Sequence, residues 1–132
     1  MATYFEKLKK LQNNAYAPYS KFRVASILTM DDGREFPGVN VENASFGGTI
    51  CAERSSFVSA ISSIGSKAKF KSMYLLAGDG DKFAMPCGFC RQVINEFVED
   101  DFVIVVYNNR GESQACTISA LLPNSFSKED LL

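Results

Sequence analysis

The sequence predicts an α/β fold, a three-layer α-β-α sandwich around a mixed five-stranded sheet. Two runs, 70–77 and 102–107, are apolar at nearly every residue, which is typical of strands covered on both faces. A helical pattern separates them, so we expect two parallel strands joined by a crossover helix. A hairpin pattern over 22–41 adds two antiparallel strands, and a short run at 112–116 adds the fifth.

The predicted elements follow the order α-β-β-α-β-α-β-β-α. They are a helix at 4–14, strands at 22–30 and 34–41, a helix at 51–64, a strand at 70–77, a helix at 88–98, strands at 102–107 and 112–116, and a helix at 117–122. Thr3 and Glu6 have the spacing of a capping box, which defines the start of the first helix. The turn Asp31-Asp32-Gly33 separates the hairpin strands. Gly65 ends the second helix, and Pro123 ends the last.

Apolar residues at helical spacing define the two middle helices. In the helix at 51–64 this face consists of Phe57, Val58, Ile61 and Ile64. In the helix at 88–98 it consists of Phe89, Val93, Ile94 and Phe97.

Composition excludes several classes of function. The chain has 132 residues, 46% hydrophobic and 22% charged, so we expect one domain over residues 1–132. A net charge of −1 argues against nucleic acid as a partner, and the absence of histidine excludes imidazole catalysis. No apolar run is long enough for a membrane span. The charged N-terminus lacks a signal-peptide pattern, which together with free thiols predicts a cytoplasmic protein.

Cys87 and Cys90 form a Cys-x-x-Cys motif at the start of a predicted helix. Three interpretations are open: a redox pair, a structural disulfide, or half of a metal site. A structural disulfide is disfavoured because the sequence has no secretion signal. A metal site needs a further ligand from elsewhere in the chain.

Cys51 is the candidate third ligand, because it also lies at the start of a predicted helix. Helix N-termini favour thiolates. We expect neighbouring parallel strands to bring both helix starts to one edge of the sheet, where α/β proteins bind ligands. Three thiolates suit one Zn²⁺ per chain and leave its fourth position open. Cys116 is the only possible fourth ligand, but its apolar surroundings predict a buried, inert thiol.

Glu53 and Arg54 follow Cys51 closely enough to border the same cavity. A carboxylate beside a metal site can transfer protons, although Glu53 could also simply stabilise a helix N-terminus. Three thiolates leave a zinc site negatively charged, and a guanidinium that donates to sulfur would offset this charge. We therefore predict Glu53 as the catalytic acid–base and Arg54 as the residue that tunes the thiolates.

These motifs resemble the zinc-dependent cytidine deaminases, in their short-chain, three-cysteine form. The resemblance covers about residues 17–126. Its motifs are Pro18-Tyr19-Ser20-Lys21-Phe22-Arg23-Val24, Asn40-Val41-Glu42-Asn43, Cys51-Ala52-Glu53-Arg54, Pro86-Cys87-Gly88-Phe89-Cys90 and Leu122-Pro123-Asn124-Ser125-Phe126. Together they are highly specific for this family.

The resemblance implies hydrolytic deamination of cytidine and deoxycytidine to uridine and deoxyuridine plus ammonia, as in pyrimidine salvage. Water attacks C4 of the ring, and Glu53 carries protons to N3 and the leaving amino group. Asn40 and Glu42 are implied to bind the sugar. Phe22 and the backbones of Ala52 and Met85 are implied to contact the base.

The resemblance also implies a homotetramer with composite active sites, in which Phe126 reaches a neighbouring pocket. Phe46 departs from the family, which often has a tyrosine there that reaches a neighbouring chain's sugar. Phenylalanine has no hydroxyl, so we do not expect that hydrogen bond in this protein. Phe126 stands in a polar tail and needs a partner surface to be buried. A composite site would also enclose a pocket that lies at the open edge of the sheet.

Three other functions remain open from the sequence. One is deamination of a cytosine-containing antibiotic such as blasticidin S, against which Asn40, Glu42 and Asn43 argue. A second is deamination of nucleic acid, which the near-neutral charge disfavours. The third is a non-enzymatic, zinc-stabilised module, which would leave Glu53 without a role.

Overall fold

A mixed five-stranded sheet forms the centre of the molecule, which a computed structural model describes over all residues 1–132. The strand order is β2-β1-β3-β4-β5. The strands are β1 (Val24–Met30), β2 (Glu35–Val39), β3 (Phe70–Ala77), β4 (Val103–Tyr107) and β5 (Ser113–Thr117). Only β3 and β4 pair in parallel, and the other three pairs are antiparallel. The predicted fold class is confirmed.

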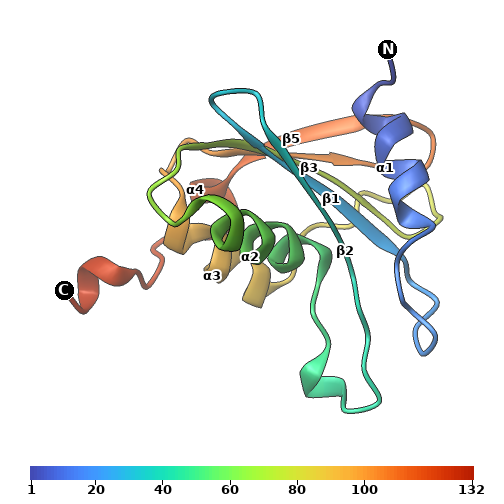
Figure 1. Cartoon of the computed structure of the whole chain (residues 1–132), viewed down its shortest axis with the longest axis horizontal. Coiled ribbons are helices and arrows are strands. Elements are labelled where there is room, and N and C mark those ends of the chain that lie inside the picture. The colour runs from blue at the N-terminus through green and yellow to red at the C-terminus, as the bar shows by residue number, and fades with distance from the viewer.

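Helices cover both faces of this sheet (Figure 1). Helix α1 (Tyr4–Gln12) lies on one face, and the opposite face carries α2 (Ala52–Ile64), α3 (Gly88–Phe97) and α4 (Ile118–Leu121). The strands β1 and β3 are buried on both sides, since Ile27 and Leu76 pack on the α1 side while Leu28 and Leu75 belong to the larger core beneath α2 and α3. This two-sided burial explains why both strands are apolar on nearly every residue. No helix combines the length and apolar composition needed to cross a membrane.

The helix boundaries follow the capping signals. Thr3 and Glu6 form the predicted capping box at the start of α1. Cys51 and Cys87 are the N-cap residues of α2 and α3, and both have extended backbone angles. Each cysteine therefore lies at the positive end of a helix dipole. Two short 3₁₀ turns, Phe46–Gly48 and Lys128–Asp130, were not anticipated from the sequence.

The predicted arrangement of the strands near the metal site was wrong in one respect. Helix α2 connects β2 to β3, and these two strands are not neighbours, because β1 lies between them. Both are antiparallel to β1 and therefore run in the same direction. The starts of α2 and α3 consequently still lie at one edge of the sheet.

Two apolar residues of the middle helices are exposed in the single chain. Val58 is 56% exposed, because α2 packs on the sheet through a face made mainly of small residues. The buried residues of α2 are Ala52, Glu53, Ser56, Phe57 and Ala60. Phe89 in the first turn of α3 is 78% exposed and lies over the Arg54 guanidinium, 5.9 Å from it. Hydrophobic periodicity cannot detect a packing face of Ala and Ser, which allows a helix to approach a sheet closely.

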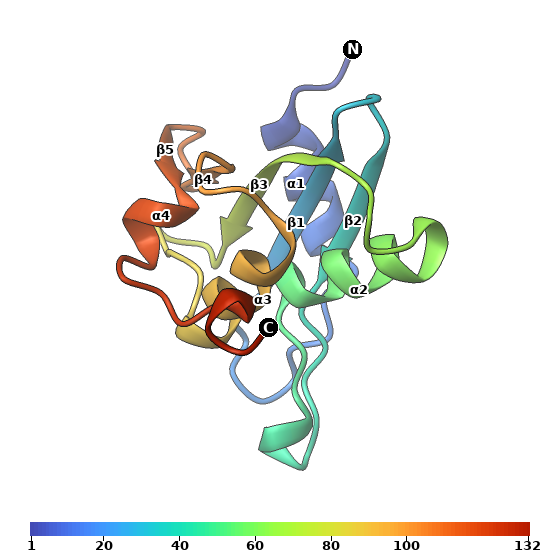
Figure 2. The same cartoon turned by 90° about the vertical axis from the view of Figure 1, so that its left-hand side faces the viewer.

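The segment between β2 and α2 projects from the body of the molecule (Figure 2). Its two arms are joined by a bridge between Val41 and Ile50, and its tip carries Phe46, which is 75% exposed. The C-terminal segment after α4 projects on the same side of the sheet as α3 (Figure 1), and its hydrogen bonds are with that helix. Gln92 of α3 holds it by donating a hydrogen bond to the Phe126 carbonyl at 2.8 Å.

Candidate metal centre and active site

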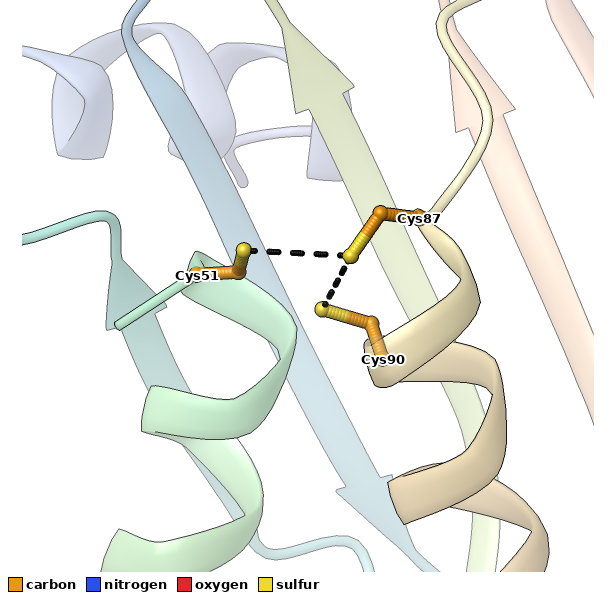
Figure 3. A group of neighbouring side chains, drawn as sticks. All are labelled: Cys51, Cys87 and Cys90. Atoms are coloured by element: carbon orange, nitrogen blue, oxygen red, sulfur yellow. Dashed lines mark hydrogen bonds between the residues drawn. The ribbon is translucent and has the colours of Figure 1, made fainter. Parts of the chain in front are cut away.

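The starts of α2 and α3 bring three cysteines together. The Sγ atoms of Cys51, Cys87 and Cys90 all lie within 4.8 Å of one another. Figure 3 shows their side chains pointing toward one another from the two helix ends. The distance between the sulfurs of Cys51 and Cys87 is 4.0 Å, and that between Cys87 and Cys90 is 3.4 Å. Cys116 is not part of this cluster and lies half-buried on the edge strand β5.

This cluster fits a zinc ion. Tetrahedral coordination with Zn–S bonds of about 2.3 Å separates two sulfurs by about 3.8 Å, close to the distances found here. The three thiols are free rather than paired in disulfides. A hydrogen bond from Cys90, followed by the nearby Arg54, lowers the pKa of the Cys51 thiol to about 5. The pKa of Cys90 is raised, because Cys90 is the partner that keeps its proton. A metal ion bound here would displace the Cys90 proton, whereas the Cys51 thiolate is favoured before any ion binds.

The two arginines beside the cluster have different environments. Arg54 donates from Nη2 to the Cys51 sulfur at 3.4 Å and to the Thr49 carbonyl at 3.3 Å. Arg91 donates instead to two backbone carbonyls, those of Pro86 at 2.7 Å and Leu121 at 2.8 Å. Arg54 is therefore placed to offset thiolate charge. Arg91 instead links Pro86, which precedes α3, to Leu121 at the end of α4.

Glu53 is buried in the first turn of α2, with only 5% of its surface exposed. Burial raises the pKa of its carboxyl to about 7, and the negative charge of Cys51 adds to this effect. A carboxyl with such a pKa exchanges protons readily near neutral pH. Its position next to a metal ligand brings this proton within reach of the metal site.

A cavity of about 460 Å³ opens beside the cysteines. This volume lies in the range of small-molecule sites, about 300–1,000 Å³. The cavity is lined by Ser20, Phe22, Val24, Asn40, Glu42, Thr49, Cys51, Glu53, Leu75, Ala77, Ala84, Met85 and Cys87. Cys51, Cys87 and Glu53 thus share one cavity with four predicted substrate contacts: Phe22, Asn40, Glu42 and Met85. The roles of these residues stay predictions.

Polar contacts hold Asn40 and Glu42 at the other end of this cavity. The Asn40 amide accepts a hydrogen bond from the Val24 N–H at 2.9 Å and donates one to the Phe22 carbonyl at 2.8 Å. The Glu42 carboxylate accepts hydrogen bonds from the backbone N–H of Tyr19, at 2.9 Å, and from the Ser20 hydroxyl. These contacts, with the Ser20 hydroxyl foremost, lower the pKa of Glu42.

Phe22 forms one wall of the cavity and packs against Gly78. A Cβ atom on Gly78 would lie 2.5 Å from the Phe22 ring, and the φ angle of +73° at Gly78 also favours glycine. Gln12 of α1 supports this contact from below, because its buried amide donates to the carbonyls of Arg23 and Gly78, both at 3.1 Å. Sequence inspection missed Gln12, which belongs to no pattern that indicates chemistry, and assigned no role to Ser20 although this residue lies within a family motif.

Two predicted substrate contacts lie outside this cavity. Ala52 is fully buried, and its carbonyl accepts a hydrogen bond from Ser26 at 2.8 Å. Phe126 is 60% exposed and lines a separate groove with Gln92 and Leu131. A single chain therefore does not bring Phe126 to its own cavity.

The family model for the cytidine and deoxycytidylate deaminase zinc-binding region matches residues 1–106. This chain belongs to that family. It thus contains a zinc-binding deaminase domain, and Cys51, Cys87 and Cys90 form the cluster that could bind the ion. The recognition made from the sequence motifs is confirmed.

Individual relatives agree with this assignment. A cytidine deaminase of Sporosarcina psychrophila is 42% identical over 123 residues, which cover 93% of this chain and 88% of that protein. A probable cytidine deaminase of Dictyostelium discoideum is 42% identical over 121 residues, covering 92% and 80%. The crystal structure of a cytidine deaminase from Burkholderia pseudomallei superposes with a TM-score of 0.87 at 36% identity, covering 96% of this chain and 100% of that one.

Proposed function

We propose that this protein is a cytidine deaminase that hydrolyses cytidine to uridine and ammonia and uses one zinc ion per chain. The observation that carries this proposal is the meeting of three thiols and a buried carboxyl at one cavity of nucleoside size. Family membership and the named relatives agree with it. We extend the proposal to deoxycytidine as a second substrate and to a role in pyrimidine salvage. Residues 1–132 would act as one domain.

Cys51, Cys87 and Cys90 would hold the zinc ion. When bound, zinc supplies Lewis-acid activation of water at neutral pH. Arg54 would offset the negative charge of the three thiolates, as supported by its hydrogen bond to the Cys51 sulfur. Thiol ligands require a reducing environment, which supports a cytoplasmic location.

Glu53 would carry the protons of the reaction. Its carboxylate takes a proton from the attacking water and delivers it to N3 of the pyrimidine. It then takes the proton of the new hydroxyl on C4 and delivers it to the amino group, so that ammonia leaves as the C4 carbonyl of uridine forms. A pKa near 7 suits both steps, because the group must accept and release a proton in each turnover. Burial also keeps bulk water away from the transferred proton.

The remaining lining residues would bind the nucleoside. Phe22 packs against the pyrimidine and the Met85 backbone contacts its polar edge, whereas buried Ala52 does not line the cavity. Asn40 and Glu42 bind the sugar hydroxyls, which the lowered pKa of Glu42 supports, since an ionised carboxylate accepts hydrogen bonds strongly. Binding energy from the sugar helps the base reach its transition state.

A homotetramer with composite sites completes the proposal. Three aromatic side chains outside the cavity lining, Phe46, Phe89 and Phe126, are largely exposed in the single chain. Large exposed apolar side chains can mark interaction surfaces. Contact with neighbouring copies would bury them and would place Phe126 at the cavity of another chain.

A spectrophotometric assay tests the proposed function. The protein is incubated separately with cytidine, deoxycytidine, blasticidin S and a cytosine-containing oligonucleotide, and absorbance follows the loss of the amino group. We expect turnover of both nucleosides and none of the oligonucleotide. Preferential turnover of blasticidin S, or no turnover of any substrate by zinc-loaded protein, would contradict the proposal.

A further inference from the structure

Two buried serines lie directly beneath the active-site turn of α2. Ser26 belongs to β1 and Ser56 to the second turn of α2, and both are completely buried. Their Oγ atoms are hydrogen-bonded to each other. The Ser26 hydroxyl also donates to the Ala52 carbonyl at 2.8 Å. Ala52 lies between Cys51 and Glu53, so this polar contact reaches the segment that carries a metal ligand and the acid–base group.

The direction of both hydrogen bonds follows from the number of protons available. A serine hydroxyl has one proton to donate, and Ser26 donates its proton to the Ala52 carbonyl. The Ser56 hydroxyl must therefore be the donor to Ser26. The result is an ordered chain from Ser56 through Ser26 to the backbone of Ala52. Hydrogen bonds in such a chain strengthen one another in a buried environment.

The second strand of the hairpin fixes the same turn by close contact. Gly38 of β2 lies so near to α2 that an added Cβ atom would be 2.6 Å from the Ser56 nitrogen and would also strike the Ala52 carbonyl oxygen. Only a residue without a side chain allows this approach. The first turn of α2 is thus held on β1 by hydrogen bonds and on β2 by backbone packing.

We propose that Ser26 and Ser56 are positioning residues that set the orientation of the first turn of α2, and with it Cys51 and Glu53. This inference rests on the proposed function, because it assigns the two serines to the reaction through Glu53. Neither serine lines the substrate cavity, so both act through the turn. A displacement of this turn by a fraction of an ångström moves a proton-transfer group out of reach of its target, which lowers kcat strongly.

The chain offers a matched control on the same strand. Thr29 of β1 and Ser72 of β3 form a second buried hydroxyl pair, with 2.7 Å between their oxygens. This pair joins two strands and does not contact α2. Loss of either pair removes one buried hydroxyl contact, but only the Ser26–Ser56 pair supports the active-site turn.

The experiment compares Ser26→Ala, Ser56→Ala and the double variant with Thr29→Val and Ser72→Ala. For each protein we measure thermal stability, kcat and KM for cytidine, the rate of zinc release to a chelator, and the thiolate-to-metal absorption of the cobalt-substituted form. We expect the serine variants to lower kcat about tenfold to a hundredfold, with KM within about threefold, because Glu53 is displaced while the sugar contacts stay intact. The control variants should lose stability with kcat within about twofold of the wild type.

The proposal is overturned if the serine variants and the controls change kcat equally, since general loss of stability would then explain both. It is also overturned if the serine variants keep wild-type kcat and an unchanged cobalt spectrum. If the double variant does not fold, the single serine variants are compared with the controls in its place. If the wild-type protein does not deaminate cytidine, the proposed function fails, while zinc release and the cobalt spectrum still report whether the serines position Cys51.

Discussion

Glu42 and Glu53 line the same cavity, but their surroundings shift their pKa values in opposite directions. Burial raises the pKa of Glu53 to about 7. Glu42 is half-buried in the cavity lining, where the Ser20 hydroxyl and two backbone N–H groups lower its pKa. The first carboxyl can therefore gain and lose a proton near neutral pH, whereas the second stays ionised.

This difference separates two parts of the cavity lining, a chemical end around Glu53 and a binding end around Glu42. Tertiary packing determines the chemical end, since the first turn of α2 is enclosed between strands and the start of α3. Polar contacts of two exposed segments determine the binding end. Changes at the chemical end should therefore act mainly on metal content and kcat, and changes at the binding end mainly on KM.

The largest expected effect comes from removing a metal ligand. Cys90→Ala should abolish zinc binding and with it all measurable activity, because the two remaining thiolates are too few to hold the ion. Cys116→Ala is the control and should keep full zinc content and most activity, since Cys116 lies apart from the cluster. Metal analysis of the purified proteins measures both. Loss of zinc in Cys116→Ala would indicate a four-cysteine structural site instead.

Glu53→Gln should retain zinc and fold but lower kcat by about a thousandfold or more, because an amide cannot transfer the protons of several steps. Steady-state kinetics and metal analysis on the same preparation separate this effect from metal loss. A variant that keeps more than about a tenth of the wild-type rate would mean that another group moves the protons.

Glu42→Gln tests the binding end. It should lower kcat/KM for cytidine about tenfold to a hundredfold, mainly through KM, because a charged acceptor of sugar hydrogen bonds is lost. Turnover of free cytosine, which has no sugar, should be equally poor in both proteins and serves as the control. An equal loss of kcat with unchanged KM would place Glu42 at the chemical end and break the distinction.

Phe126→Ala should weaken nucleoside binding about tenfold without removing zinc, if this aromatic side chain completes the cavity of a neighbouring chain. Light scattering of the wild type should give a mass near that of four chains. A fully active monomer would contradict the composite site, and the binding end would then be complete within a single chain.

The smallest expected effect is the pH dependence of the contact between Glu42 and the segment around Ser20. Because folding lowers the pKa of Glu42 below its ordinary value of 4.5, the unfolded chain binds this proton more tightly. The carboxylate therefore stabilises the folded protein above pH 4.5, and this contribution is lost as the pH falls through the lowered pKa. Urea unfolding of the wild type and Glu42→Gln should differ near neutral pH and converge in acid. A constant difference at all pH values would contradict this assignment.

Local signals in the sequence were sufficient for the elements and for the three cysteines that the structure brings together. The capping pair Thr3 and Glu6 and the turn at Gly33 are short-range features, so they act in the same way in any tertiary context. Cysteines at two helix starts were likewise recognisable from spacing alone. The exposure of Val58 and Phe89 did not follow from the sequence, because periodicity gives the angle between side chains but not which side of the helix meets the sheet.

The sequence by itself determined the element order, the three thiols and the family, since each depends on residue types at fixed spacing. Only the tertiary structure decided that β1 separates β2 from β3 and that small residues bring α2 close to the sheet. It also decided the opposite pKa shifts of Glu42 and Glu53, which depend on burial and on partners distant in the chain. The physical reason is that desolvation and close packing are properties of the assembled surroundings of a side chain, which no local pattern encodes.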